Sequence, residues 1–461
     1  MKKIFLTLVL ALIVATTAMA AKPKYVFLFI GDGMGMGHIM SAETYNRTVL
    51  GNDQSILMMQ FPVASFAMTY SASSPITDSA AAGTALATGV KTKNYMIGVN
   101  PDTVAVTSVA HELKEKFGYG VGLVTAVAYD DATPATHYAH RANRNMFEGI
   151  NYDGARSNFD FIGGAYTHQA EKGDQKKVDA IFEDYRQNGY TVAHGIDELR
   201  ANPGKKVLLT AKKPVTPNEI GYTIDSIPGA MTLQQLTQEC LDHMMKVSPN
   251  KFFMMVEGGN IDHAAHGNDG GTVVKEVLNF QKSIQIAYDF YKKHPSETLI
   301  VITADHDTGG MTIGVSDGPK IPNLKNVDYQ RISKEQFSDL CVREPRNSWA
   351  EMKQLLSDKL GFWSHIDINE VEEARMLDSF GKLKANKGDG SQKTLYKEFN
   401  NFTAIVFDIL NHKTGFGFTT FSHTGNPVPV FAVGAGCENF KDVNNNIEIP
   451  QKIRRLTGLR K

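Results

Sequence analysis

Carboxylate and imidazole side chains, the usual ligands of zinc, gather in two segments of the sequence. Asp305-His306-Asp307 directly follows an apolar run, and Asp262 and His266 lie four residues apart. A helix would put Asp262 and His266 on one face, and one carboxylate with one imidazole at that spacing suits zinc. Glu257 ends another apolar run and suits a harder ion such as magnesium. The alternatives are a structural charge cluster and a surface helix with an ion pair.

A serine that could attack phosphorus lies in the segment Thr77–Gly89. Its alanine-rich sequence favours a tightly packed helix with Ser79 at the N-terminus. The free amides and the positive end of the helix dipole favour an anion there. The alternative is an ordinary N-cap serine, and the local sequence does not separate the two roles.

Three further segments carry possible ligands of a metal ion or a phosphate group. Gly31-Asp32-Gly33 follows an apolar run, and its glycines would let the backbone turn sharply beside a ligand. Thr133-Pro134 marks a helix start, and Arg144, about three turns further on, could return as a bidentate phosphate clamp. His423 precedes the last apolar run. Each segment alone is as consistent with a capped turn, a solvated arginine or a loop histidine.

The elements that must position these side chains are short runs that are apolar on both faces. They suit buried strands, mostly parallel, and predict an α/β doubly wound sheet with helices on both faces. Ligands bind beyond the carboxyl ends of such strands, so we expect the acidic and histidine residues to converge there. The runs cover Tyr25–Ile30, Gly120–Val124, Phe252–Val256, Leu299–Ala304 and Val428–Val433.

Two stretches look like additions to this sheet. Residues 150–205 are polar with helical patches, and residues 315–412 are charged, with amphipathic helices expected at Glu351–Leu360 and Glu370–Leu377. We therefore predict one catalytic domain over residues 21–461, with an inserted subdomain at about 315–412 before the last strand. Such an insertion more often shapes an entrance or a subunit contact than it carries catalysis.

The composition and the first residues bound the class of protein. The 461 residues carry 48 Lys and Arg against 49 Asp and Glu, a balance that argues against nucleic acid as a specific partner. Residues 1–20 combine two lysines, a short apolar run and Ala18-Met19-Ala20, which predicts a cleaved signal peptide and an exported, periplasmic or extracellular protein without a membrane anchor. Three scattered cysteines leave a disulfide open.

Taken together and in order, these segments resemble the alkaline phosphatase family. The motifs are Gly31-Asp32-Gly33-Met34-Gly35, Asp78-Ser79-Ala80-Ala81-Ala82, Asp131-Ala132-Thr133-Pro134, Val256-Glu257-Gly258, Ile261-Asp262 with His266, Thr303-Ala304-Asp305-His306 and His423-Thr424-Gly425. The resemblance implies hydrolysis of small phosphate monoesters through a phosphoserine on Ser79, at a site with two zinc ions and one magnesium ion, in an enzyme that is typically a homodimer.

The resemblance also implies a role for each residue. Asp262, His266 and His423 would hold one zinc ion, and Asp32, Asp305 and His306 the other, which Ser79 also contacts. Asp32, Thr133 and Glu257 would hold magnesium. Arg144 would bind the phosphate oxygens, and Asp78 would orient it. Asp131 and His263 occupy positions behind the ligands that vary in the family and tune metal affinity.

Two rival functions remain at this point. Diesterases and nucleotide pyrophosphatases of the same superfamily typically use a threonine nucleophile and two metal ions, whereas this sequence has Ser79 with Thr133, Glu257 and Arg144. A catalytically silent protein that binds phosphate or metal on the same fold is the other rival.

Overall fold

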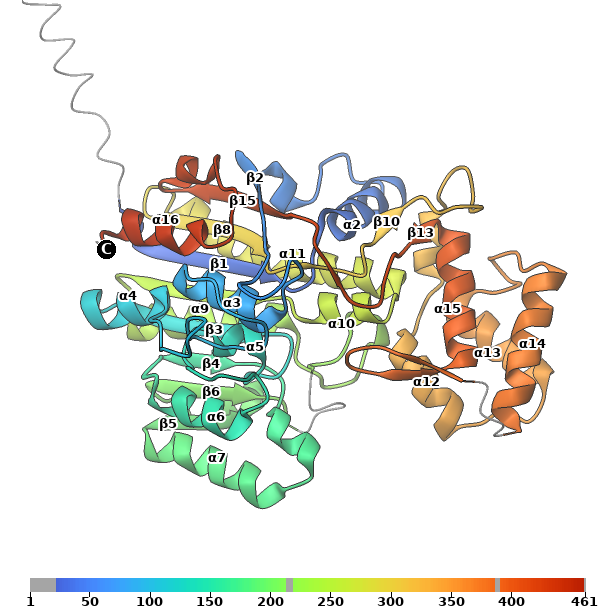
Figure 1. The fold of residues 1–461 in the computed structure, drawn as a ribbon, viewed down its shortest axis with the longest axis horizontal. Coiled ribbons are helices and arrows are strands. Elements are labelled where there is room, and N and C mark those ends of the chain that lie inside the picture. The colour runs from blue at the N-terminus through green and yellow to red at the C-terminus, as the bar shows by residue number, and fades with distance from the viewer. Residues whose placement is uncertain (1–21, 213–218, 386–389, 460–461) are drawn as a thin grey trace, which may run out of the picture.

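A computed structural model describes residues 22–212, 219–385 and 390–459 (Figure 1). The predicted signal peptide lies outside these ranges. A nine-stranded sheet with the strand order β2-β15-β8-β1-β7-β3-β4-β6-β5 forms the centre of the fold. Its strands are β1 Tyr25–Gly31, β2 Val63–Ala67, β3 Gly120–Thr125, β4 Phe161–Gly163, β5 Tyr190–His194, β6 Lys206–Thr210, β7 Phe252–Glu257, β8 Thr298–Ala304 and β15 Val428–Gly434.

Helices surround the sheet. They are α2 Met36–Thr48, α3 Ser79–Thr88, α4 Val109–Phe117, α5 Ala132–Ala135, α6 Phe147–Arg156, α7 Gln175–Gln187, α8 Ile196–Ala201, α9 Leu233–Val247, α10 Asn260–His266, α11 Gly270–Lys293, α12 Lys334–Arg343, α13 Trp349–Leu360, α14 Glu370–Lys384, α15 Asn401–Thr414 and α16 Glu448–Thr457. Short 3₁₀ helices lie at η1 Leu57–Gln60, η2 His168–Lys172, η3 Thr223–Asp225, η4 Leu324–Asp328 and η5 Cys437–Phe440. The predicted α/β fold is therefore confirmed.

The central strands β1, β3, β7 and β8 are buried along their whole length and run parallel. The predicted runs match these strands to within a residue at each end. The last run is different, because β15 is antiparallel to both of its neighbours, β8 and β2. An apolar run shows that a strand is buried on both faces and carries no information about its direction.

The interpretation of residues 150–205 as an addition to the sheet is wrong. Strands β4 and β5 lie in this stretch and pair in parallel with β6, which extends the main sheet to its edge. β4 has three residues, and β5 includes the half-buried polar residues Thr191 and His194, so neither gives a long apolar run. Short strands near a sheet edge leave little pattern in the sequence.

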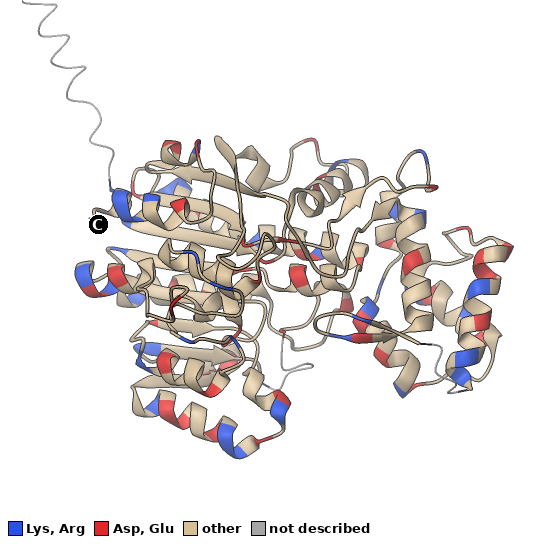
Figure 2. Cartoon of the chain, in the orientation of Figure 1, with Lys and Arg blue, Asp and Glu red and all other residues tan. Residues whose placement is uncertain are grey.

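The predicted insertion forms a group of helices beside the sheet, α12 to α15, which are drawn in orange shades (Figure 1). Side chains from Ile332 to Leu410 form a hydrophobic core of their own, separate from the core of the sheet. The two expected helices are present as α13 and α14. Charges of both signs are interspersed along these helices (Figure 2), which is typical of a solvated surface.

Three pairs of short antiparallel strands complete the chain: β9 Asp307–Thr308 with β14 His423–Thr424, β10 Thr312–Ile313 with β13 Phe416–Gly417, and β11 Ser391–Lys393 with β12 Glu398–Asn400. Within the described ranges, every helix is too short or too polar to span a lipid bilayer. Cys240, Cys341 and Cys437 are free thiols.

Candidate functional site

Acidic residues meet where the three central parallel strands end. Ile30 of β1 lies opposite Glu257 of β7, and Gly31 lies opposite Ala304 of β8. Asp32 and Asp305 each follow directly, so this register brings Asp32, Glu257 and Asp305 to the same edge of the sheet. All three side chains are buried. The convergence expected from the sequence is therefore present in the structure.

The glycines after β1 allow this close packing. Gly33 has a φ of +67°, and a Cβ there would lie 2.7 Å from Asp262 Oδ1. A Cβ on Gly35 would lie 1.9 Å from Asp307 Oδ1. A side chain at either position would displace an acidic group, and the positive φ of Gly33 disfavours one further.

Ser79 is the first residue of α3 and is fully buried. The N-cap is the preceding Asp78, whose side chain accepts a hydrogen bond from the Ala81 amide at 3.0 Å. The ordinary capping role is thus taken by Asp78. Ser79 Oγ instead lies 3.1 Å from His306 Nε2, at the end of β8. The N-terminus of α3 and the end of β8 therefore meet at the Ser79 hydroxyl.

Helix α10 places Asp262 and His266 together, as their spacing predicts, with His266 Nε2 at 3.4 Å from Asp262 Oδ2. Every residue of α10 is buried, which excludes the alternative of a surface helix. The β9–β14 pair aligns His423 with Thr308, so His423 reaches the same place from far along the chain. The rings of His306 and His423 are stacked at 3.5 Å.

The Nε2 atoms of His266 and His423 face each other, and neither atom carries a proton. His266 Nδ1 lies 2.7 Å from the Phe421 carbonyl oxygen, and His423 Nδ1 lies 2.9 Å from that of Thr77. A carbonyl only accepts hydrogen bonds, so each neutral ring carries its proton on Nδ1. The two Nε2 atoms, 3.1 Å apart, then present lone pairs to each other. This donor set fits a cation such as zinc.

Several oxygens at the strand ends and on α5 are buried without a hydrogen-bond partner: Asp32 Oδ1, Thr133 Oγ1, Glu257 Oε1 and Asp305 Oδ2. Burial and the neighbouring carboxylates raise the pKa of Asp32 well above its ordinary value, and burial raises the pKa of Glu257 to about 7. So many buried acids without a compensating charge fit a cation better than an empty site. Carboxylate and hydroxyl oxygens of this kind suit magnesium.

Asp262 has a different environment, because imidazoles surround it. Burial alone would raise the pKa of Asp262, but His266, His423 and His306 hold it below its ordinary value. Burial lowers the pKa of His306 well below its ordinary value. The carboxylate form of Asp262 and the neutral form of His306 are the forms that bind metals.

Arg144 lies between two carboxylates beside this cluster. Its Nη2 donates to Asp131 Oδ1 at 2.9 Å, and its Nη1 lies 3.7 Å from Asp78 Oδ2. The prediction that a helix carries Arg144 is wrong. Helix α5 begins after its N-cap residue, Asp131, and ends at Ala135. Turns after α5 return the chain instead, and the Arg144 amide donates to the Tyr95 carbonyl at 2.7 Å.

Some residues of the site are not evident from the sequence. They include His168, whose Nε2 lies 3.6 Å from Asp131 Oδ1, and Glu219, whose Oε2 lies 3.3 Å from Nδ1 of His263. Thr308 donates a hydrogen bond to Asp262 Oδ1. Tyr396, from the insertion, donates to Asp262 Oδ2 at 3.2 Å. No local pattern in the sequence marks Tyr396.

Among the residues that the structure describes, two groups of side chains could each hold a metal ion, and His306 belongs to both. Asp262, His306 and His423 form one, and Asp32, Asp305 and His306 form the other, each with ligand atoms within 4.8 Å of one another. The family model for alkaline phosphatase matches residues 23–159 and 150–459. The chain belongs to the alkaline phosphatase family.

Individual relatives agree with this family over most of the chain. Alkaline phosphatase 4 of Bacillus subtilis is 30% identical, over 93% of this chain and 87% of its own length. The repressible alkaline phosphatase of Saccharomyces cerevisiae is 27% identical, over 93% and 79%. The crystal structure of a cold-active alkaline phosphatase from a Shewanella species superposes with a TM-score of 0.79 at 26% identity, covering 95% of this chain and all (100%) of that one. Family membership makes the chain a metal-dependent phosphatase that hydrolyses phosphate monoesters.

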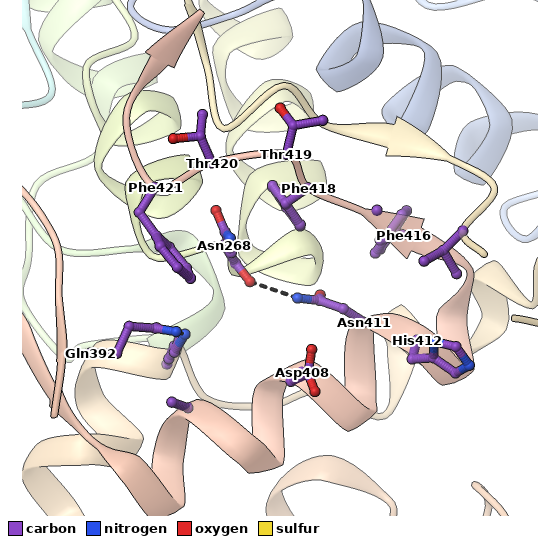
Figure 3. Close-up of a pocket in the computed structure, with 14 residues that line it drawn as sticks. Asn268, Gln392, Asp408, Asn411, His412, Phe416, Phe418, Thr419, Thr420 and Phe421 are labelled. Atoms are coloured by element: carbon purple, nitrogen blue, oxygen red, sulfur yellow. Dashed lines mark hydrogen bonds between the residues drawn. The ribbon is translucent and has the colours of Figure 1, made fainter. Parts of the chain in front are cut away.

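A separate pocket lies behind the phosphatase site, where the insertion meets the end of α10 (Figure 3). Its cavity of about 260 Å³ is lined by Phe416, Phe418 and Phe421 and by polar side chains that include Asn268 and Gln392. Asn411 donates to the Asn268 carbonyl at 2.7 Å. The Phe421 carbonyl that orients His266 belongs to this wall, so the pocket backs the site.

Proposed function

We propose that Ser79 is the nucleophile of this phosphatase. Its Oγ forms a bond to phosphorus as the bond between phosphorus and the leaving alkoxide breaks, and the alcohol departs with a proton. Water then attacks the phosphoserine, inorganic phosphate leaves, and Ser79 regains its hydroxyl. The position of Ser79 at the start of α3, where free amides and the helix dipole favour an anion, supports this role.

We propose three metal positions around Ser79, as the family resemblance implies. Asp262, His266 and His423 would hold one zinc ion, and Asp32, Asp305 and His306 the other. Asp32, Thr133 and Glu257 would hold magnesium. Two zinc ions so placed would stabilise the attacking and leaving oxygens. The facing Nε2 atoms and the unpartnered buried oxygens support these sets.

Other side chains would bind the phosphoryl group, or would orient Arg144 and the metal ligands. Arg144 would donate to the phosphoryl oxygens, because its guanidinium carries more donors than Asp131 and Asp78 accept. Asp78 and Asp131 would hold Arg144 in place from two sides. His263, on the helix that carries Asp262, would act from behind the metal ligands.

A single contact connects Ser79 to both groups of possible metal ligands. Ser79 Oγ lies 3.1 Å from His306 Nε2, and His306 belongs to both groups of possible metal ligands. The proposed nucleophile therefore lies beside the histidine that the two groups have in common.

The test is hydrolysis of a chromogenic phosphate monoester and a diester by the chain from Ala21. We expect monoester turnover that is lost on chelation and restored by zinc and magnesium. Ser79→Ala should reduce kcat by at least about 1000-fold, while the exposed Ser296→Ala should match the wild type. Trapping of a phosphoserine on Ser79 in a brief acid quench would identify the intermediate.

The outcomes separate the rivals. Preferred cleavage of the diester would move the assignment to the diesterases. Bound zinc without turnover of either substrate would indicate a silent binding protein. Full activity in Ser79→Ala would exclude Ser79 as the nucleophile.

Export and assembly are further proposals. We infer that residues 1–20 are a signal peptide that directs the protein to the periplasm or the exterior, which intact-mass measurement of the secreted protein would test.

We also propose a homodimer. Phe66, Met68 and Tyr70 expose 53%, 51% and 43% of their surface on and just beyond β2, the edge strand. A monomeric mass in solution would contradict it.

A further inference from the structure

We propose that Tyr396, a residue of the insertion, is a positioning residue that holds the Asp262 carboxylate in the orientation that binds zinc. This inference rests on the proposed function, in which Asp262 is a zinc ligand. It gives the insertion a direct part in the metal site, beyond shaping an entrance.

Tyr396 contacts three residues of α10. Its hydroxyl donates to Asp262 Oδ2 at 3.2 Å. Its ring lies over the His263 ring with a centroid distance of 3.9 Å, and meets the His266 ring edge-on at 5.2 Å and 81°. Packing against two imidazoles leaves the phenol little freedom, so its hydroxyl is directed at the carboxylate.

A second hydroxyl group, from a different element, holds the other carboxylate oxygen of Asp262. Thr308, in β9, donates to Asp262 Oδ1. One hydroxyl therefore bonds each carboxylate oxygen, and each oxygen keeps a further lone pair for a metal ion. Two donors on separate elements fix the plane of the carboxylate, and β9 alone cannot do so.

The β11–β12 hairpin that carries Tyr396 is anchored to α12. In its turn, the Thr394 amide donates to the Lys397 carbonyl at 2.9 Å. Lys397 Nζ donates to Asp339 Oδ1 at 2.8 Å, and Asn400 Nδ2 donates to Ser338 Oγ at 3.1 Å. These bonds lie on the C-terminal side of Tyr396 and fix the position of the hairpin relative to α10.

Lys334 joins this assembly to α10 itself. Its side chain is buried, with 3% of the residue exposed, and Nζ donates to the Gly267 carbonyl at 2.8 Å and to Gln392 Oε1 at 2.6 Å. Gln392 lies at the edge of the pocket in Figure 3. One ammonium group thus bridges the end of α10 and the hairpin, so Tyr396 is placed relative to Asp262 by a fixed connection.

The test compares Tyr396→Phe with the wild type and with Tyr152→Phe, an exposed tyrosine on α6. Tyr396→Phe keeps the ring against His263 and removes only the hydroxyl. Zinc affinity is measured by competition with a chromophoric chelator, without substrate. We expect a roughly tenfold weaker affinity at one of the two zinc positions, since loss of a hydrogen bond to a metal ligand costs at least that much. At saturating zinc, KM and kcat should return to within about twofold of the wild type.

Two results would overturn the proposal. Zinc affinity equal to that of the wild type would show that the hydroxyl does not orient Asp262. A KM changed at saturating zinc, with unchanged zinc affinity, would make Tyr396 a substrate contact instead. Failure of the proposed function looks different, because the wild type itself would then bind no zinc or hydrolyse no monoester.

Discussion

Asp78 makes contacts with two different purposes at the start of α3. Its Oδ1 accepts the hydrogen bond of the Ala81 amide, and its Oδ2 accepts that of the Tyr95 amide at 2.9 Å and faces Arg144. The same carboxylate thus caps the helix that presents Ser79 and borders the proposed phosphate-binding guanidinium. Substitutions that separate shape from charge can divide these purposes.

Asp78→Asn keeps the capping oxygen and removes the charge. We expect stability to fall by about 1 kcal/mol, because the new amino group cannot accept the hydrogen bond of the Tyr95 amide. Phosphate inhibition should weaken by about fivefold, because Arg144 loses one charged partner worth about 1 kcal/mol. Asp78→Ala should show the same weakening and lose about 2 kcal/mol of stability, because it removes the cap as well as the acceptor of the Tyr95 amide. Denaturant unfolding and phosphate inhibition constants check both. Equal stability losses in the two variants would contradict the division.

At the scale of elements, α11 carries a buried acid away from the proposed metal ligands. Glu276 lies on α11 and accepts a hydrogen bond from the Thr223 amide at 2.6 Å. Burial raises the pKa of Glu276 from 4.5 to about 7, more than that hydrogen bond lowers it. The folded state therefore holds a proton that the unfolded chain has released between these pH values, and stability from this group falls as the pH rises through that window.

Glu276→Gln removes this dependence. The variant should resemble the wild type at pH 4.5 and exceed its free energy of unfolding at pH 8 by up to about 3 kcal/mol, the equivalent of the raised pKa. Denaturant titrations at both pH values measure the difference. Glu183→Gln, on the exposed face of α7, is the control. A Glu276→Gln variant less stable than the wild type at pH 8 would show that the ionised form is the stabilising one.

At the scale of the whole molecule, two hydrophobic cores share one chain. The core of the insertion includes Phe407, which is fully buried and lies 5.8 Å from the Phe337 ring. Separate cores with few shared side chains are expected to open separately. The proposed metal site draws on α10, whose Ile261, Ala264 and Ala265 belong to the core of the sheet, and on Tyr396, which comes from the insertion.

Phe407→Ala should destabilise the insertion by about 3–5 kcal/mol. Amides of α12 to α15 should exchange hydrogen faster, while those of β1, β7 and β8 keep the wild-type rate. Hydrogen exchange with peptide-level mass spectrometry resolves the two regions, and Phe407→Leu provides a milder matched change. Equal acceleration in the sheet would mean that both cores unfold as one unit.

Much of the site could be predicted from the sequence because parallel strands end at one edge. Asp32, Glu257 and Asp305 each follow an apolar run, and Asp262 and His266 share a helical spacing. Other features depend on contacts between distant segments. The direction of β15, the turns that return Arg144, and Tyr396, which is 134 residues from Asp262 in sequence, leave no local pattern. The sequence around His423 is as consistent with a loop histidine, and only the family resemblance implied its role. The β9–β14 pairing explains how His423 reaches the site.

The place of β15 in the sheet has a consequence for biosynthesis. β15 is the last strand to be made, yet it lies between β8 and the edge strand β2, and His423 enters just before it. A ribosome must therefore synthesise nearly the whole chain before β2 can join the sheet and before the imidazole of His423 can face that of His266. Closure of the sheet and completion of the proposed zinc site then become one late event, and a chain stalled before residue 423 has neither.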